Sequence, residues 1–343
     1  MPCRIAINGY GRIGRCVLRA LYEGGHAGNL QIVAINDLTD GPTLAHLTRY
    51  DSTHGRFQGE VSLSGSTLGI NGDDIALSCI AMVDQLPWES LDVDLVLECS
   101  GAFSDRPTAE QHLERGAKRV LFSQPAEADV DATLVWGINH ETAEASHTVL
   151  SAASCTTNCI VPVLQVLDNA FGIENGMITT IHSAMNDQPV IDSFHSADLR
   201  KTRSAMNSII PVDTALAKGI ERILPRLAGK LEAQAIRVPT VNVSAMELTV
   251  LLKSECDAAA INALIEQESR QLLPNVLGYT HEPLASCDFN HDKRSAIVDL
   301  TQTRTAGHKL AKLLVWFDNE WAYGNRMLDI ASYLANLGQS PTD

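Results

Sequence analysis

Apolar residues in the first 150 positions gather in short continuous runs, separated by segments with helical spacing. Residues 3–8 and 31–35 are two such runs, and in residues 12–23 between them the apolar positions fall on one helical face. Further runs and one more helical segment follow at 95–97, 110–115, 120–122, 133–136 and 148–150. Strands that alternate with helices are typical of a doubly wound parallel α/β sheet. We predict such a sheet for a first domain, residues 1–154.

From residue 155 onward the pattern changes. An apolar helix at 156–170 is followed by strands in which polar and apolar residues alternate, at 177–181, 232–238, 245–252, 296–299 and 313–317. This alternation predicts an α+β domain over residues 155–318, with a mostly antiparallel sheet and helices on one side. Residues 183–206 are polar and lack periodicity, and a loop of that length usually has a function or packs against a partner. A last helix is predicted at 320–338.

Composition and charge narrow the classes of function. The chain has 343 residues, 45% of them apolar and 20% charged, which suits a globular protein of two domains. Its formal charge of -15 argues against binding to nucleic acid or to an anionic membrane surface. No apolar run approaches the roughly 18 residues that span a bilayer, and the first residues lead into a strand rather than a signal peptide. We therefore expect a cytoplasmic protein.

Cysteine use leads to the same expectation. Eight cysteines are scattered along the chain, and without an export signal most are expected to be reduced thiols in the interior. The chain contains no C-x-x-C pair, and Cys155 and Cys159 lack two further ligands at a typical spacing. We expect no metal site.

The segment from Gly9 to Gly14 fits the dinucleotide-binding pattern G-x-G-x-x-G. It follows a strand, opens a helix and is followed by a second strand that leads to Asp37, which is the context that the pattern requires. Gly9 permits a tight turn, Gly11 lets the backbone approach a pyrophosphate, and Gly14 lets helix and strand pack closely. The helix N-terminus offers its N–H groups to the phosphates. Asp37 is placed to bind ribose hydroxyls and to repel a 2′-phosphate, so we predict NAD bound to a Rossmann domain.

Cys155 is the best candidate nucleophile among the cysteines. It follows the strand that ends near Leu150 and begins the long helix, where unpaired N–H groups and the helix dipole favour a thiolate. Cys159 lies one turn further along and is expected to be a packed structural residue. His182 follows the strand at 177–181 and is a candidate general base and acid. Because the chain has eleven histidines, its spacing alone does not single out this pairing.

Five segments, taken in order, resemble glyceraldehyde-3-phosphate dehydrogenases, and the resemblance extends over nearly the whole chain. They are residues 7–15 (INGYGRIGR), 50–57 (YDSTHGRF), 154–159 (SCTTNC), 237–240 (RVPT) and 318–321 (DNEW), of which the thiol segment is highly specific. The resemblance implies that a catalytic domain follows the Rossmann domain and that a terminal helix, residues 319–343, packs on the first domain. It also implies a homotetramer in which residues 183–206 reach the cofactor of a neighbouring subunit.

The resemblance implies a role for each residue that matches the family's motifs. Cys155 attacks an aldehyde to form a thiohemiacetal, and His182 takes the thiol proton and steadies the thiolate as an ion pair. Cofactor contacts are implied for the backbone N–H groups of Arg12 and Ile13, for Ser123 and, at the nicotinamide carboxamide, for Asn319. Contacts with a sugar-phosphate substrate are implied for Ser154, Thr156, Arg200, Thr214, Ala215 and Arg237.

Several positions resemble the branch of this family that oxidises D-erythrose 4-phosphate to 4-phosphoerythronate, a step toward pyridoxal phosphate. After His182 the chain reads Ser-Ala-Met where glycolytic members read Ala-Tyr-Thr, and Met185 cannot donate the hydrogen bond that the threonine gives to phosphate. Residues 211–214 (PVDT) replace a run of small hydroxyl residues, and Ala215 stands where glycolytic members have Gly. A weakened second anion site beside an added carboxylate implies that water, rather than inorganic phosphate, releases the acyl group.

Two alternatives remain open at this point. The first is the phosphorylating activity of the glycolytic glyceraldehyde-3-phosphate dehydrogenases. The second is a redox-sensing or RNA-binding protein on the same fold without turnover, against which the acidic charge and the set of Cys155, His182 and Asn319 both count. Ala81 is one further departure, because relatives often have Arg there beside the adenine.

Overall fold

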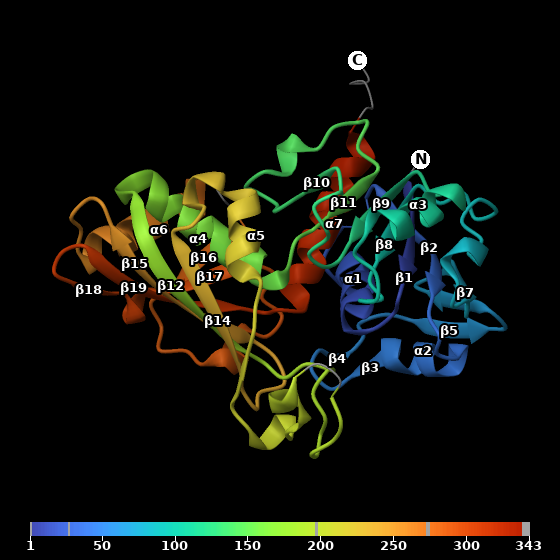
Figure 1. Cartoon of the computed structure of the whole chain (residues 1–343). Helices are drawn as coiled ribbons and strands as arrows, with labels where there is room; N and C mark the ends of the chain where they lie inside the picture. The colour runs from blue at the N-terminus through green and yellow to red at the C-terminus, as the bar shows by residue number, and fades with distance from the viewer. Residues whose placement is uncertain (1, 27, 196–197, 272–274, 338–343) are drawn as a thin grey trace. The chain divides into compact units, whose positions relative to one another are not determined.

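The structure, a computed structural model, describes residues 2–26, 28–195, 198–271 and 275–337. The chain divides into two units, Met1–Ser154 with Tyr323–Asp343, and Cys155–Ala322. Each unit is built on one large sheet (Figure 1). The residues from 338 onward, which belong to the predicted terminal helix, lie outside the described residues, as do 196–197 of the predicted long loop.

The first unit has a nine-stranded sheet around β1 (Cys3–Asn8). This strand pairs in parallel with β2 (Leu30–Asn36) on one side and with β8 (Leu95–Glu98) on the other. The full order is β10-β11-β9-β8-β1-β2-β7-β6-β5. The remaining strands are β5 (Val61–Ser64), β6 (Thr67–Ile70), β7 (Asp73–Ser78), β9 (Arg119–Phe122), β10 (Ala132–Thr133) and β11 (Val149–Ser151). Only the β5–β6–β7 edge is antiparallel, so the predicted doubly wound parallel sheet is confirmed.

Helices α1 (Arg12–Glu23), α2 (Gly41–Arg49) and α3 (Arg106–Glu114) belong to this unit. The bounds of α1 are those predicted, whereas α3 begins four residues before the predicted segment because Asp105 caps it, accepting a hydrogen bond from the Thr108 amide at 2.9 Å. Helix α2 was not predicted, although it has the same kind of start: Asp40 accepts from the Thr43 amide at 2.8 Å. A small hairpin, β3 (Tyr50–Asp51) with β4 (Gly55–Arg56), follows α2.

The strand predicted at 133–136 is wrong beyond its first residue. Strand β10 ends at Thr133, and a turn follows. The Asn139 side chain explains the change, because its Oδ1 accepts from the Val135 amide at 2.7 Å and its Nδ2 donates to the Thr133 carbonyl at 2.8 Å. A side chain that bonds the backbone in this way competes with a strand ladder, and apolar periodicity gives no sign of it.

The last helix, α7 (Trp321–Asn336), lies mostly in the first unit. Its residues from Tyr323 onward pack there: Asn29 Nδ2 donates to Ser332 Oγ at 2.9 Å, and Arg119 Nη1 donates to the Leu334 carbonyl at 2.8 Å. Met327, Leu328, Ile330 and Ala331 are fully buried. Helix α7 therefore completes the core of the first unit from Tyr323 onward.

The second unit has an eight-stranded sheet in the order β13-β14-β12-β15-β19-β17-β16, with β18 paired to β19. Its strands are β12 (Ile173–His182), β13 (Ile210–Val212), β14 (Leu231–Arg237), β15 (Ser244–Leu252), β16 (Leu277–Thr280), β17 (Ala296–Asp299), β18 (Arg304–Ala306) and β19 (Leu310–Phe317). Only β12–β14 and β16–β17 are parallel pairs. The predicted mostly antiparallel sheet is confirmed.

Three helices pack on this sheet: α4 (Cys155–Phe171), α5 (Leu216–Ile223) and α6 (Ala258–Gln271) (Figure 1). The longest, α4, contacts β12, β15, β17 and β19. Between β12 and β13 the described residues, 183–195 and 198–209, include two short 3-10 turns, η3 (Leu199–Thr202) and η4 (Ala205–Asn207), and no longer helix. No helix in the described part of the chain combines the length and the apolar character needed to cross a membrane.

Candidate active site

The glycine-rich loop of the first unit follows β1 and has no room for side chains at two of its three glycines. Gly9 has φ +89, and a Cβ there would lie 2.4 Å from the Ser100 backbone. A Cβ on Gly14 would lie 2.3 Å from the Gly9 carbonyl oxygen. At Gly11, in contrast, a Cβ would meet no atom within 4 Å. Gly9 and Gly14 therefore pack tightly against neighbouring backbone, whereas Gly11 faces open space, as the approach of a pyrophosphate requires.

Helix α1 begins directly after this loop. Its N-cap residue, Gly11, supplies no side-chain cap, and the first turn contains no acidic residue. The backbone N–H groups of Arg12 and Ile13 therefore lie at an uncapped positive helix end, which favours an anion. The Arg12 side chain is directed elsewhere, in an ion pair with Asp51.

Asp37 follows β2 and Ser123 follows β9, two parallel strands that β8 and β1 separate in the sheet. The Asp37 carboxylate accepts from the Tyr10 amide at 2.7 Å and from the Thr39 amide at 2.9 Å, so its position is fixed by backbone. Ser123 follows β9, and its amide donates to the Glu98 carbonyl at 3.0 Å. The carboxyl ends of β1, β2 and β9 thus carry the predicted cofactor residues of this unit, which is where parallel sheets bind nucleotides.

Cys155 is the first residue of α4 and is partly exposed. Burial raises the pKa of its thiol to about 11, against the opposing effects of Arg237 and of the backbone N–H groups of Thr156 and Cys155. The helix start thus favours the thiolate as expected, but desolvation outweighs it. The prediction of a thiolate from the helix N-terminus alone was therefore incomplete. Cys159, one turn further, is fully buried.

His182 ends β12 and faces the sulfur. Its Nε2 lies 3.9 Å from Cys155 Sγ, and its Nδ1 lies 2.8 Å from the Ser183 carbonyl oxygen. A carbonyl only accepts, so the proton is on Nδ1, and Nε2 presents a lone pair to the thiol. Burial, and then the charge of Arg237, lower the pKa of His182 to about 4. His182 is therefore a neutral imidazole at pH 7 and Cys155 a neutral thiol, so the expected ion pair of thiolate and imidazolium is not the resting state, because burial disfavours both charges.

Arg237 stands beside His182, because the parallel register of β12 and β14 pairs these two residues. Its Nε and Nη1 are buried and have no hydrogen-bond partner among the described residues. Burial lowers the pKa of the guanidinium, yet arginine remains charged in proteins. A buried guanidinium with unpartnered N–H groups is a site for an anionic ligand.

Asp187 and Lys201 form an ion pair in the same region, with Nζ 2.8 Å from Oδ2. Burial acts to raise the pKa of Asp187, but the hydrogen bond and charge of Lys201 outweigh it and keep the pKa below its usual value. The Asp187 charge also acts on His182 and on Arg237. Neither residue was predicted from sequence, since both lie in the segment without periodicity.

Asn319 follows β19 and is 9% exposed. Its Oδ1 accepts from Ser244 Oγ at 2.8 Å and from Ser183 Oγ at 3.0 Å. Asp318 holds the same turn, since its Oδ1 accepts from the Glu320 and Trp321 amides. The predicted carboxamide-binding residue therefore has a fixed oxygen, and its role in the second unit depends on two serines that the sequence did not single out.

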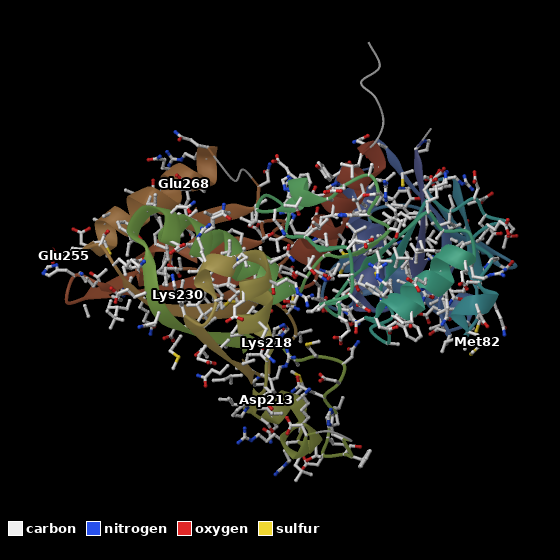
Figure 2. The ribbon with its side chains drawn as sticks, turned by 45° about the horizontal axis from the view of Figure 1, so that its top comes forward. Met82, Asp213, Lys218, Lys230, Glu255 and Glu268 are labelled. Atoms are coloured by element: carbon white, nitrogen blue, oxygen red, sulfur yellow. The ribbon has the colours of Figure 1, made fainter. Side chains whose placement is uncertain are left out.

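The other predicted substrate residues are less closely grouped. Ser154 and Thr156 flank Cys155, and Thr214 and Ala215 form the turn into α5, where Thr214 Oγ1 accepts from the Leu216 amide at 3.2 Å. Asp213 beside them is exposed, as is Lys218 on α5 (Figure 2). Arg200 is exposed on η3, and it is the neighbouring Lys201, not Arg200, that pairs with Asp187.

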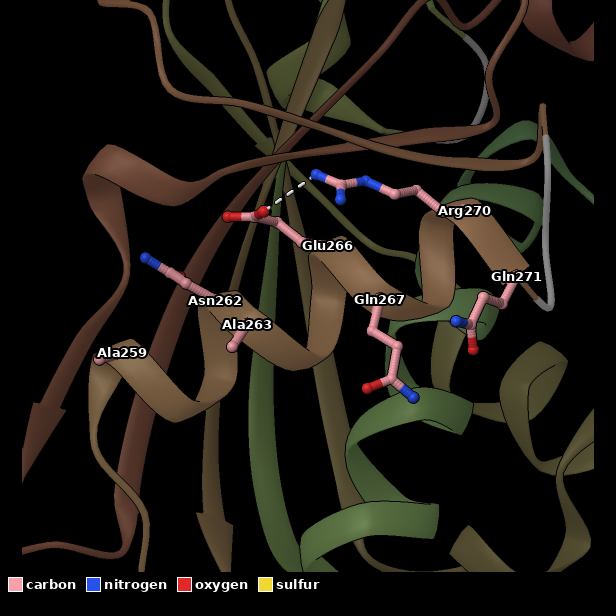
Figure 3. A pocket seen from close by; sticks show the side chains of 7 residues that line it. All are labelled: Ala259, Asn262, Ala263, Glu266, Gln267, Arg270 and Gln271. Carbon is pink, nitrogen blue, oxygen red and sulfur yellow. Dashed lines mark hydrogen bonds and ion pairs between the residues drawn. The ribbon is translucent and has the colours of Figure 1, made fainter.

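A surface pocket of about 530 Å³ lies along α6 (Figure 3). Its charged pair is Glu266 with Arg270, 3.2 Å apart, and these charges neutralise one another. No predicted site residue lines this pocket. Its other lining residues are Ala259, Asn262, Ala263, Gln267 and Gln271.

Two protein-family models match the chain. Residues 3–106 match the NAD binding domain of glyceraldehyde 3-phosphate dehydrogenase, and residues 154–319 match its C-terminal domain. Together the two matches cover more than half of the chain. The first unit is accordingly a Rossmann-type domain whose cofactor is NAD, and its loop and helix start fit that group.

Proposed function

This chain belongs to the glyceraldehyde-3-phosphate dehydrogenase family and is an NAD-dependent dehydrogenase, and from that premise we propose that its substrate is D-erythrose 4-phosphate. The product is 4-phosphoerythronate, released by water, as a precursor of pyridoxal phosphate. One observation carries the proposal: of the cations that interact with Asp187, Arg237 has N–H groups left for one phosphate, whereas Lys201 is taken up by an ion pair. Arg237 has buried nitrogen atoms without a partner among the described residues, whereas Lys201 is already paired with Asp187.

The first step joins Cys155 to the aldehyde carbon of the substrate. His182 Nε2 accepts the thiol proton as the S–C bond forms, and the carbonyl oxygen then takes that proton to give a thiohemiacetal. The Ser183 carbonyl holds the His182 ring through Nδ1 during both transfers. Because the pKa of the thiol is about 11, little thiolate forms at neutral pH without this base.

The second step oxidises the same carbon. Its hydrogen leaves as a hydride while His182 takes the hydroxyl proton, so that a thioester remains on Cys155. NAD supplies the acceptor for the hydride. The Asn319 amide binds the carboxamide of the nicotinamide, because its oxygen is already occupied by Ser183 and Ser244 and its N–H groups are left for a ligand.

The third step distinguishes the two members of the family. After His182 has released its proton to solvent, it takes one from water, which attacks the thioester and frees Cys155. Arg237 holds the phosphate of the substrate through its planar fork. Asp187 neutralises the charge of Lys201, and Met185 offers no hydroxyl donor, so we infer that a second phosphate is held weakly. Water is therefore the favoured acceptor.

The deciding experiment measures NADH formation from D-erythrose 4-phosphate and from D-glyceraldehyde 3-phosphate, each with and without inorganic phosphate. We expect the higher kcat/KM with the four-carbon sugar, no requirement for phosphate, and a free acid as product. Strict phosphate dependence together with a strong preference for the three-carbon sugar would instead assign the phosphorylating glycolytic activity. Loss of NADH formation with both sugars would leave the redox-sensing or RNA-binding alternative.

We also propose that the chain forms a homotetramer in which residues 183–206 reach a neighbouring subunit. Two described apolar side chains of this segment are strongly exposed, Phe194 at 87% and Leu199 at 84%, and exposed large apolar side chains that lie close along the chain support an interface there. Light scattering after size-exclusion chromatography is expected to give four chains of 37.1 kDa, and a Phe194→Ser/Leu199→Ser variant is expected to dissociate. A monomeric wild type would refute this assembly.

All eight cysteines are free thiols, which supports a cytoplasmic location.

A further inference from the structure

Ser183 stands between the base and the carboxamide-binding residue and contacts both. Its carbonyl oxygen accepts from His182 Nδ1 at 2.8 Å, and its hydroxyl donates to Asn319 Oδ1 at 3.0 Å. The second partner of Asn319, Ser244, is linked to Ser183 as well, because the Ser183 amide donates to Ser244 Oγ at 3.1 Å. Ser183 and Ser244 are 1% and 0% exposed, so water does not substitute for these bonds.

The hydrogen-bond inventory of this group fixes which way the Asn319 amide points. Each serine hydroxyl has one proton to donate, and both protons go to Asn319 Oδ1. If the amide were reversed, its nitrogen would face the hydroxyls, and the Ser183 proton would have no acceptor among the described residues except across 3.5 Å to Ser244. A buried donor without an acceptor is costly. The observed orientation is therefore the one that gives both serine hydroxyls an acceptor.

We propose that Ser183 and Ser244 are positioning residues that hold the Asn319 oxygen inward, so that Asn319 presents only N–H donors to the cofactor and selects a ligand carbonyl at the nicotinamide 3-position. No described residue accepts a hydrogen bond from Asn319 Nδ2, which leaves both of its protons for that ligand. This inference rests on the proposed role of Asn319 and adds to it the residues that set its polarity.

The test compares NAD with its 3-acetylpyridine analogue, which keeps the carbonyl acceptor but has a methyl group in place of the amide NH₂. In the wild type, Asn319 only donates, so it binds the carbonyl oxygen at the 3-position of either cofactor. In a Ser183→Ala/Ser244→Ala variant the amide is free to reverse, and its oxygen then accepts from the NH₂ of NAD but repels the acetyl carbonyl. We expect kcat/KM for the analogue to fall about 3- to 10-fold more than that for NAD. An unchanged ratio of the two values would overturn the proposal.

A matched control comes from the same strand. Thr180 on β12 is 1% exposed, and its hydroxyl has no hydrogen-bond partner among the described residues. Thr180→Val therefore removes a buried hydroxyl without touching Asn319, and the cofactor ratio is expected to stay at the wild-type value. If Thr180→Val shifts the ratio as much as the serine variant does, the effect is one of packing and the proposal fails.

Two further measurements separate this inference from the proposed function. In an Asn319→Ala background the serine substitutions should no longer change the cofactor ratio, as a double-mutant cycle requires of coupled residues. If Asn319→Ala alone leaves kinetics with NAD unchanged, the proposed role of Asn319 fails first.

Alkylation of Cys155 by iodoacetamide without cofactor reports on His182. A slower alkylation in the serine variant would assign the effect to His182 and overturn the inference.

Discussion

The two units offer different kinds of chemical group to their proposed ligands. In the first, the groups proposed to bind the cofactor phosphates are backbone N–H groups, and they belong to one contiguous segment from Gly9 to the start of α1. In the second, side chains from separated parts of the chain meet, among them Cys155, His182 and Arg237. A backbone site tolerates changes of side chain but not an added Cβ. A side-chain site has the opposite sensitivity, because each group acts through its own chemistry and pKa.

The largest effect is expected from the sulfur. Cys155→Ser removes the nucleophile, and we expect turnover to fall by at least about 10⁴-fold, while the affinity for NAD measured by calorimetry stays near the wild-type value. Cys287→Ser, which changes an exposed thiol, is the control and should retain full activity. Substantial activity in Cys155→Ser would remove the thiol mechanism.

The next largest effect is expected from His182→Gln, which should slow the chemical step by roughly 10²–10⁴-fold at pH 7. The defect should shrink as pH rises, because the pKa of the Cys155 thiol is raised to about 11 and hydroxide increasingly ionises it without a base. In the wild type, alkylation of Cys155 should be nearly independent of pH from 6 to 8, since the pKa of His182 is lowered to about 4 and the ring is already neutral. A defect that grows with pH would contradict both assignments.

The glycine loop offers a paired test of the backbone site. Gly11→Ala meets open space, so the fold should be retained while the added methyl group blocks the approach of the pyrophosphate, raising the Kd for NAD about 10- to 100-fold. Gly9→Ala places a Cβ 2.4 Å from the Ser100 backbone at φ +89, and it should lower Tm as well. Both variants should leave the alkylation of Cys155 unchanged. Tight NAD binding by Gly11→Ala would argue against this binding mode.

The smallest effect concerns the acyl acceptor. Asp187→Asn releases Lys201 from its ion pair, and inorganic phosphate should then accelerate turnover about 2- to 10-fold, with acyl phosphate appearing among the products. Asp192→Asn is the matched control, because Asp192 pairs with Arg203 on the same segment but both side chains are exposed. If phosphate has the same effect on both variants, the Asp187–Lys201 pair does not set the choice of acceptor.

The main elements were predictable where apolar periodicity was strong and long. Helix α1 and strands β1 and β17 have the predicted bounds, and α4 begins within one residue of them. The missed elements are short or weakly patterned, such as α2, or are edge strands such as β5. Residues 134–136, wrongly predicted as strand, show the limit of apolar periodicity as a guide. The Asn139 side chain takes up backbone groups of Thr133 and Val135 that would otherwise pair with a neighbouring strand, and a turn forms instead.

Site residues, too, could be predicted where a local sequence pattern marks them and not elsewhere. The glycine fingerprint, Asp37 and the helix position of Cys155 are local features, so six to thirty consecutive residues were enough to identify them. Asp187, Lys201 and Ser183 have no local signal, since ordinary polar residues in a segment without periodicity look the same whether they contact a site or solvent. Ser244 begins β15, and nothing in the strand pattern distinguishes it from any other serine at a strand end. Their roles emerged only from distances and from the count of hydrogen-bond donors and acceptors.

The sequence by itself determined the two-part α/β and α+β architecture, the glycine-rich loop and the candidate nucleophile, because these depend on interactions between residues close along the chain. Tertiary structure alone decided the protonation state of the Cys155–His182 pair, the pairing of Lys201 with Asp187 and the orientation of the Asn319 amide. Each of these depends on burial and on charges or hydroxyls from distant segments. Desolvation and hydrogen-bond satisfaction act through space, and the order of residues does not encode them in any local pattern.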